Sequence, residues 1–141
     1  MMNIAENLSD ISLNYFSLLR KLSSKFDLTL SQTLLLLYVP FDGISVSNLS
    51  DKLGIDISTM TRNIQRIEKL GLIKRSKDLN DKRSIKLNLS TRGIKLVKNI
   101  NHDIHLNLEP ILQRYNFDKI EQIQSSLESL GWDLYLHRKD L

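Results

Sequence analysis

Apolar side chains recur every three or four residues through the first part of the chain, which is the period of an amphipathic helix. This pattern predicts a first helix from about residue 7 to residue 26. Thr29 and Gln32 have the spacing of a capping box, so we predict that a second helix starts there and continues through residues 34–39. Pro40 ends this helix, because the residue before a proline is disfavoured in the helical conformation.

The central stretch predicts two short helices joined by a tight turn, after a turn at residues 42–43 and a short strand at residues 44–46. Val46, Leu49 and Leu53 form one apolar stripe, which marks the first of the two helices. Gly54 follows directly, at the position where helices commonly end in a left-handed residue that glycine adopts without steric cost. Asp56 then caps the second helix, because its carboxylate can accept the free backbone N–H groups of the first turn.

The second of these helices has one apolar face and one face that is polar and cationic. Ordinary surface helices mix charges of both signs, whereas the single acid of this helix, Glu68, lies away from the polar face. This distribution is typical of the recognition helix of a helix-turn-helix; the alternative is an ordinary amphipathic helix with a solvated face. The apolar face consists of Ile57, Met60, Ile64 and Ile67, and the polar face of Ser58, Thr61, Arg62, Gln65, Arg66 and Lys69.

After Gly71 the apolar period changes from helical to alternating, which predicts two strands. The first covers residues 72–75. The second covers residues 84–89, where Ile85, Leu87 and Leu89 alternate with polar side chains. A polar loop joins them and contains an Asn-Asp pair at residues 80–81 that is typical of turns. We interpret this hairpin as a wing with a cationic tip, packed beside the helix-turn-helix.

Two further helices are predicted in the C-terminal third. Ser90 or Thr91 caps the first of them, which should kink or end at Pro110. Asp118 and Glu121 have the spacing of a capping box for the last helix, and the phenylalanine before them is placed as its hydrophobic staple.

The first helix and the last two helices carry more apolar surface than one small domain needs. We expect this surplus to be buried against a second copy of the chain. The alternative is that these helices pack only on the core of their own chain. The stripe of the last helix consists of Ile120, Ile123, Leu127, Leu130 and Leu134.

The composition narrows the class of protein. A length of 141 residues with 41% hydrophobic residues fits one globular domain. The absence of cysteine excludes disulfides, thiolate metal sites and thiol redox sensing. The N-terminal residues lack the pattern of a signal peptide, and the longest apolar run, residues 34–41, is too short to cross a bilayer. We therefore expect a cytoplasmic protein.

Charge is distributed unevenly along the chain. Residues 57–98 contain 12 Lys and Arg against 3 Asp and Glu, a net charge of +9, whereas the other residues contain 8 against 13, a net charge of −5. A basic middle between acidic ends indicates that a polyanion binds the middle alone. An anionic membrane would require an aromatic and aliphatic stripe beside the cations, and Trp132 is far away in the chain.

Three weaker signals have ordinary explanations. His102 and His105 are three apart on a helix and could form half of a metal site, but a pair of exposed or interface histidines explains them better. Tyr115, Trp132 and Tyr135 could line a ligand pocket, although such residues are more often packed helix aromatics. No phosphate-binding glycine loop, nucleophile elbow or catalytic triad pattern is present, so we predict neither an enzyme nor a cofactor or metal.

Residues 49–93 resemble the multiple-antibiotic-resistance regulator (MarR) family of winged-helix transcription factors. The specific part is D-x-R-[ST] at Asp81, Arg83 and Ser84, followed by L-[ST]-x-x-G from Leu89 to Gly93. Each motif is weak alone, but their order and spacing behind the helix-turn-helix are specific. The flanking residues match the family in the order and length of helices, not in motif.

The resemblance implies a mainly α fold with a small β-wing, a winged helix-turn-helix with N- and C-terminal dimerisation helices. The resemblance implies one single domain, residues 1–141. Within this domain the DNA-binding lobe would comprise about residues 29–92, and the helical dimerisation region about residues 5–26 and 93–141. The first, fifth and sixth helices of two subunits would interlock, and the two lobes would lie on successive major grooves of a pseudo-palindromic operator.

The resemblance also assigns residues to the DNA interface. Arg83 matches the wing position that enters the minor groove, and Asp81 the position that braces the wing through a salt bridge. Lys82 replaces a residue that is often small or polar in the family, and Ser84 completes the wing motif. Cations such as Lys69, Lys74, Arg75, Lys77, Lys86 and Arg92 are better placed for phosphates. The recognition-helix positions are Ser58, Thr59, Thr61, Arg62, Gln65 and Arg66.

We therefore expect a transcriptional regulator that binds double-stranded DNA as a homodimer. The family's usual mechanism implies a repressor relieved by a small aromatic or phenolic anion, while the absence of cysteine excludes its thiol-oxidation switch. The alternative is a winged-helix module that binds proteins and lacks DNA readout. The cationic recognition face favours the regulator.

Overall fold

Residues 3–141, which the computed structural model describes, form six helices and one three-stranded sheet. The residue contacts divide the chain into two compact units, one that extends to Ile104 and one that comprises His105–Leu141, and each is described by itself. Within the described residues, no helix has the length and apolar character needed to cross a membrane.

Both N-terminal helices begin at capping boxes. Helix α1, Ile4–Ser24, starts three residues earlier than predicted, because the side chain of Asn3 accepts from the backbone N of Glu6 at 3.0 Å. Helix α2, Leu30–Leu37, starts as predicted: the Thr29 hydroxyl accepts from the backbone N of Gln32 at 3.2 Å, and the Gln32 side chain accepts from the backbone N of Thr29 at 3.1 Å. Each box satisfies two backbone donors that a helix start leaves free.

The predicted helix-turn-helix is confirmed. Strand β1, Ile44–Ser45, precedes helix α3, Val46–Leu53, and helix α4, Ile57–Lys69, follows after three residues. Gly54 has φ +66° and ends α3, a left-handed conformation that favours glycine. The carboxylate of Asp56 accepts from the backbone N of Thr59 at 2.8 Å and thereby caps α4. Ser45 caps α3 by accepting from the backbone N of Asn48 at 3.1 Å.

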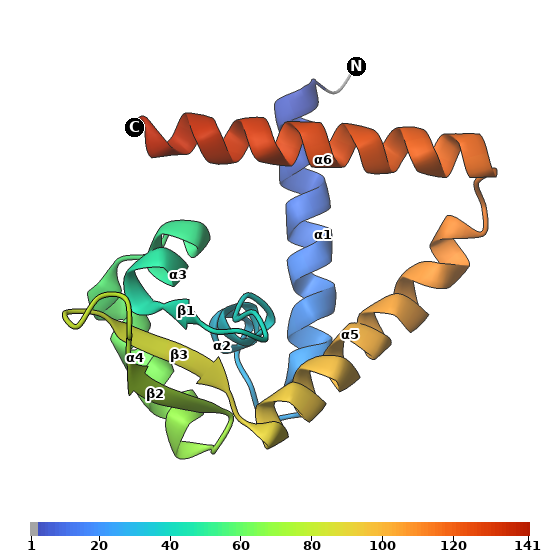
Figure 1. Cartoon of the computed structure of the whole chain (residues 1–141). Helices are drawn as coiled ribbons and strands as arrows, with labels where there is room; N and C mark the ends of the chain where they lie inside the picture. Colours follow the sequence, from blue (N-terminus) through green and yellow to red (C-terminus); the bar gives the residue numbers. More distant parts are fainter. Residues whose placement is uncertain (1–2) are drawn as a thin grey trace. The chain divides into compact units, whose positions relative to one another are not determined.

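The predicted wing is also confirmed, with strand bounds that differ by one or two residues. Strands β2, Ile73–Lys77, and β3, Ile85–Leu89, are antiparallel, and β1 pairs with the other edge of β3. Figure 1 shows β2 and β3 as neighbouring arrows beside α4, with the loop between them projecting from the sheet. The buried side chains of Ile73 and Leu87 attach the sheet to the core.

The hydrogen bonds of Ser90 explain the L-[ST]-x-x-G motif, Leu89 to Gly93, which follows the wing. The Ser90 hydroxyl donates to the backbone O of Gly71 and accepts from the backbone N of Gly93 at 2.9 Å, so Ser90 rather than Thr91 caps helix α5. The backbone N of Ser90 donates to the O of Leu72 at 3.0 Å. These bonds connect the start of α5, Thr91–Leu112, to the turn that ends α4.

The core of the first unit forms where α2, α3, α4, α5 and the sheet meet. The prediction for the apolar face of α4 is correct at three of its four positions, but Ile57 is 50% exposed because it lies in the first turn, beyond the core. The core includes Leu35, Leu36, Leu49, Met60, Ile64, Ile67, Leu87, Val97 and Ile100.

The structure corrects the predicted boundaries of the C-terminal helices. Helix α5 does not end at Pro110 but continues through it and ends two residues later, at Leu112. Helix α6, Phe117–Lys139, is capped by Asn116, whose side chain accepts from the backbone N of Lys119 at 2.9 Å. The predicted Asp118 cap therefore lies inside the first helical turn. Asparagine and aspartate are equally good caps, so the residue type alone does not show whether the helix starts after Asn116 or after Asp118.

Both units expose apolar side chains of the predicted surplus. No residue of α6 is buried within the described chain. In the first unit, Ile11 is 56% exposed and Leu13 is 66% exposed on α1. The exposed apolar residues of the second unit include Leu106, Ile111, Leu127, Trp132, Leu134 and Leu136.

Candidate nucleic-acid interface

Helix α4 presents its polar face to solvent. Arg62, Gln65, Arg66 and Lys69 are exposed, while the opposite face of the helix is buried from Met60 onward. The two faces follow from a helical period in which apolar residues recur at three- and four-residue intervals. The structure thus leaves two guanidinium groups, one amide and one ammonium group free to contact a ligand along one side of the helix.

The hydroxyl groups near the start of α4 are oriented by the protein itself. The Ser58 hydroxyl and the Thr59 hydroxyl both donate to the carboxylate of Asp56, the latter at 3.0 Å, and the Thr61 hydroxyl donates to the backbone O of Ile57 at 2.7 Å. The hydrogen bond from Ser58, followed by those from Thr59, lowers the pKa of Asp56 to about 2. With their protons engaged, these hydroxyls offer acceptor oxygens, a property that sequence reasoning missed.

The wing tip is held in shape by the side chains of two aspartates. Asp78 accepts from the backbone N of Asn80 at 2.9 Å. The carboxylate of Asp81 accepts from the backbone N of Arg83 and from the hydroxyl of Ser84, both at 3.0 Å. The expected brace at Asp81 is therefore present, but it consists of hydrogen bonds to an amide and a hydroxyl instead of a salt bridge. Asp81 thus binds the backbone of Arg83 and not its guanidinium, and Arg83 is exposed.

A hollow of about 290 Å³ lies between α4 and the wing and is lined by residues of both. Thr61 of α4 and Arg83 of the wing, which are 22 positions apart in the sequence, both line it. Ile57, which is half-exposed, also borders this hollow. The complete lining consists of Val46, Ser47, Ile57, Thr61, Ile64, Arg75, Arg83, Ser84 and Ile85.

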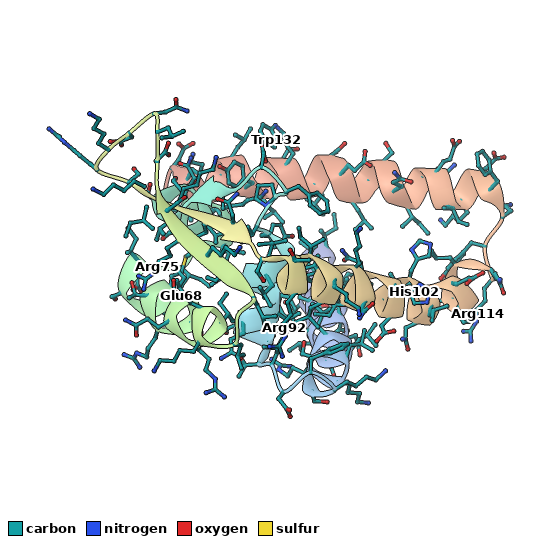
Figure 2. All side chains as sticks on the ribbon, turned by 60° about the horizontal axis from the view of Figure 1, so that its bottom comes forward. Glu68, Arg75, Arg92, His102, Arg114 and Trp132 are labelled. Atoms are coloured by element: carbon teal, nitrogen blue, oxygen red, sulfur yellow. The ribbon has the colours of Figure 1, made fainter. Side chains whose placement is uncertain are left out.

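The predicted phosphate contacts do not all have the same surroundings. Lys69, Lys74 and Lys77 are exposed. Arg75 instead binds the carboxylate of Glu68 with two nitrogen atoms, Nε to Oε2 at 2.8 Å and Nη2 to Oε1 at 2.7 Å. Figure 2 shows Glu68 and Arg75 next to each other where β2 passes α4. Sequence periodicity gives no signal for this pair, because its members lie on different elements.

The residues of the weaker signals lie at the surface. His102 and His105 are exposed, and the described residues contain no group of three potential metal ligands among His, Cys, Asp and Glu. Trp132 is 59% exposed and Tyr115 is 45% exposed. The expectation that these two aromatics are packed against the rest of the chain is therefore wrong for the single chain. The rings of Trp132 and Tyr135 lie with their centroids 5.7 Å apart on the surface of α6.

The helix-turn-helix, the hairpin beside it and the cationic faces of both define a winged helix-turn-helix protein. A family model described as MarR family matches residues 28–85, a segment that contains the helix-turn-helix and most of the wing. An uncharacterized HTH-type transcriptional regulator, YfiV of Bacillus subtilis strain 168, is 26% identical over 117 residues, which cover 82% of this chain and 73% of YfiV. Residues 28–85 are thus similar to the MarR family, and most of the chain is similar to an HTH-type transcriptional regulator.

Solved structures agree with this fold. Apo MarR from E. coli matches with a TM-score of 0.78 at 20% identity, covering 92% of this chain and 97% of MarR. MepR from S. aureus, solved in complex with DNA, matches with a TM-score of 0.77 at 22% identity, covering 95% of this chain and 99% of MepR. At sequence identities this low, the structural matches establish the shared fold alone.

Proposed function

We propose that this chain is a sequence-specific transcriptional regulator that binds double-stranded DNA as a homodimer through α4 and the wing. The observation that carries the proposal is the exposed row of Arg62, Gln65 and Arg66 on α4, together with the guanidinium of Arg83 on a wing tip shaped by hydrogen bonds. The match of residues 28–85 to the MarR family model and the structural similarity to MepR, which was solved in complex with DNA, support it.

In this proposal α4 reads base edges in the major groove. An arginine guanidinium can donate two hydrogen bonds to guanine, and the amide of Gln65 can pair with adenine, each good pair contributing about 1–3 kcal/mol of discrimination. Ser58, Thr59 and Thr61 add acceptor oxygens, which suit the amino groups of cytosine and adenine. The intramolecular hydrogen bonds of these hydroxyls fix their orientation before DNA arrives.

The wing supplies contacts to the neighbouring minor groove. Arg83 enters that groove and responds to its width through the enhanced negative potential of narrow segments. Asp81 and Ser84 hold the backbone from which Arg83 extends. Lys69, Lys74 and Lys82 bind phosphates, which adds affinity but little sequence information.

We infer a homodimer because apolar side chains remain exposed in each unit. An exposed apolar surface of this kind is usually buried in an interface, and a symmetric pair is the commonest assembly. In the proposed arrangement residues 5–26 and 93–141 form the dimerisation region and residues 29–92 the DNA-binding lobe. Two such lobes read the half-sites of a pseudo-palindromic operator, which two-fold symmetry requires.

The remaining features of the proposal follow the general pattern of the family. The chain acts in the cytoplasm as a repressor, not as an enzyme, and a small aromatic or phenolic anion releases it from DNA. Such a ligand acts by binding one arrangement of the two lobes more tightly than the other.

Fluorescence anisotropy tests the proposal with a duplex that the chain enriches from a randomised pool and with a scrambled duplex as control. The wild type is expected to prefer the enriched duplex, and its affinity should fall steeply with salt. Arg83→Ala should weaken binding, and Arg83→Lys, which keeps the charge but lacks the planar fork, should recover only part of the loss.

Failure to enrich any sequence, or equal affinity for both duplexes that does not depend on Arg83, would contradict DNA readout. The protein-interaction module would then be the better reading of the fold.

A further inference from the structure

The Glu68–Arg75 pair connects the recognition helix to the wing. Glu68 is in the last turn of α4, and Arg75 is the central residue of β2, opposite Leu87 of β3. Two parallel N–H···O hydrogen bonds at 2.7 and 2.8 Å make this a bidentate contact, which fixes the guanidinium plane as well as its distance. The pair therefore restrains both the separation and the angle of the two elements.

The charge of Arg75 is already balanced by its partner. Hydrogen bonding to Arg75 holds the pKa of Glu68 below its ordinary value, and the same contact raises the pKa of Arg75, so both groups are charged at neutral pH. A phosphate would have to compete with this carboxylate. The neighbouring Lys74 lies on the opposite face of the strand and is exposed.

Arg75 also borders both elements that are proposed to read DNA. Arg75 lines the same hollow as Arg83 of the wing and Thr61 of α4. Arg83 extends from the hairpin that Arg75 attaches to α4, since β2 and β3 are hydrogen-bonded along their whole length. A shift of β2 relative to α4 would change the distance between the major-groove and minor-groove contacts.

We propose that Glu68 and Arg75 form a latch that fixes the wing against the recognition helix, so that Arg75 is a positioning residue for DNA readout and not a phosphate contact. This inference rests on the proposed function. The latch requires the bidentate geometry, which lysine cannot reproduce. A phosphate contact requires only the positive charge.

The test compares Arg75→Lys, Glu68→Gln and Lys74→Ala with the wild type, using the enriched and scrambled duplexes over a salt series. Arg75→Lys and Glu68→Gln should each reduce the ratio of specific to scrambled affinity by about two- to fivefold, the factor expected for a partly exposed ion pair. The slope of log affinity against log salt should stay at the wild-type value in Arg75→Lys. Lys74→Ala is the matched control, and its slope should become flatter by about 0.9 with the affinity ratio unchanged.

Hydrogen exchange without DNA gives a second readout. Amides of β2 and β3 should exchange faster in Glu68→Gln than in the wild type, while thermal unfolding verifies that the variant folds. An unchanged affinity ratio in both latch variants, or tighter binding to the enriched and scrambled duplexes alike in Glu68→Gln, would overturn the latch and leave the proposed function standing. A wild type without sequence preference would overturn both.

Discussion

At the residue scale, Asp56 shows how one side chain serves both the fold and the proposed readout. Its carboxylate caps α4 through the backbone of Thr59 and orients the hydroxyls of Ser58 and Thr59. The sequence was sufficient to predict the cap, because an aspartate directly before an amphipathic helix is a strong start signal. The orientation of the two hydroxyls could not be predicted, since each side chain has several allowed rotamers and the sequence does not show which one is adopted.

The lowered pKa of Asp56 predicts how pH affects stability. Because the pKa falls from an ordinary value of 3.8 to about 2 on folding, the ionised carboxylate stabilises the folded chain above pH 4, and this contribution is lost as pH falls from about 4 to 2. Asp56→Asn is the matched variant, since asparagine is an equally good cap that does not titrate. In urea unfolding, the stability of the wild type relative to Asp56→Asn should stay constant above pH 5 and decrease below pH 4. A difference that is the same at pH 6 and pH 3 would contradict this assignment.

At the element scale, the sequence predicted the helix starts and ends that few residue types can form, and it failed where alternative caps were equivalent. Gly54 and the box of Thr29 and Gln32 were informative because few residue types satisfy those backbone positions. The start of α6 was misplaced because Asn116 and Asp118 are both acceptable caps. The brace at Asp81 was expected as a salt bridge, whereas the tight turn at the tip presents an amide and a hydroxyl at hydrogen-bond distance.

The packing of α5 against the turn after α4 depends on the absence of a side chain at Gly93. A Cβ atom there would lie 2.0 Å from the backbone O of Leu72, closer than any real contact. Gly93→Ala should therefore lower the free energy of unfolding by about 1–3 kcal/mol or more, because backbone on both sides must move. Gly131→Ala is the control, since a Cβ there meets nothing within 4 Å, and it should raise helix stability by about 0.5–1 kcal/mol.

Denaturant unfolding of the two glycine variants measures this difference. Equal stability of Gly93→Ala and the wild type would show that the packing of α5 does not depend on the close approach of Gly93 to the backbone of Leu72.

At the scale of the whole molecule, the two units bury their apolar side chains to different extents. The first unit contains a buried core in which α4 and the sheet are anchored, whereas α6 buries no side chain in the described chain. The helical period of the last third predicted a helix, but the period could not say which copy of the chain would cover the apolar stripe. This limit is physical, because an apolar face specifies burial and not the identity of the partner.

Trp132, the single tryptophan of the chain, can report on the proposed dimer. It is 59% exposed in the chain alone, and neighbouring Leu134 is 47% exposed. We expect the chain to sediment as a dimer at micromolar concentration and Leu134→Glu to shift it toward monomer, because a charge on the buried stripe is costly. Trp132 emission should move to longer wavelength in parallel. A wild type that remains monomeric under these conditions would contradict the dimer.

We propose that the exposed face of α4 reads base edges, once in each half of a symmetric site. The most direct measurement is the affinity of wild type and Arg62→Ala for the enriched duplex and for versions with each base pair substituted. Arg62→Ala should remove about 1–3 kcal/mol of discrimination at one base pair in each half-site and leave the other positions unchanged. A uniform loss of affinity at every position, or a loss in one half-site alone, would contradict base readout by α4 of a symmetric dimer.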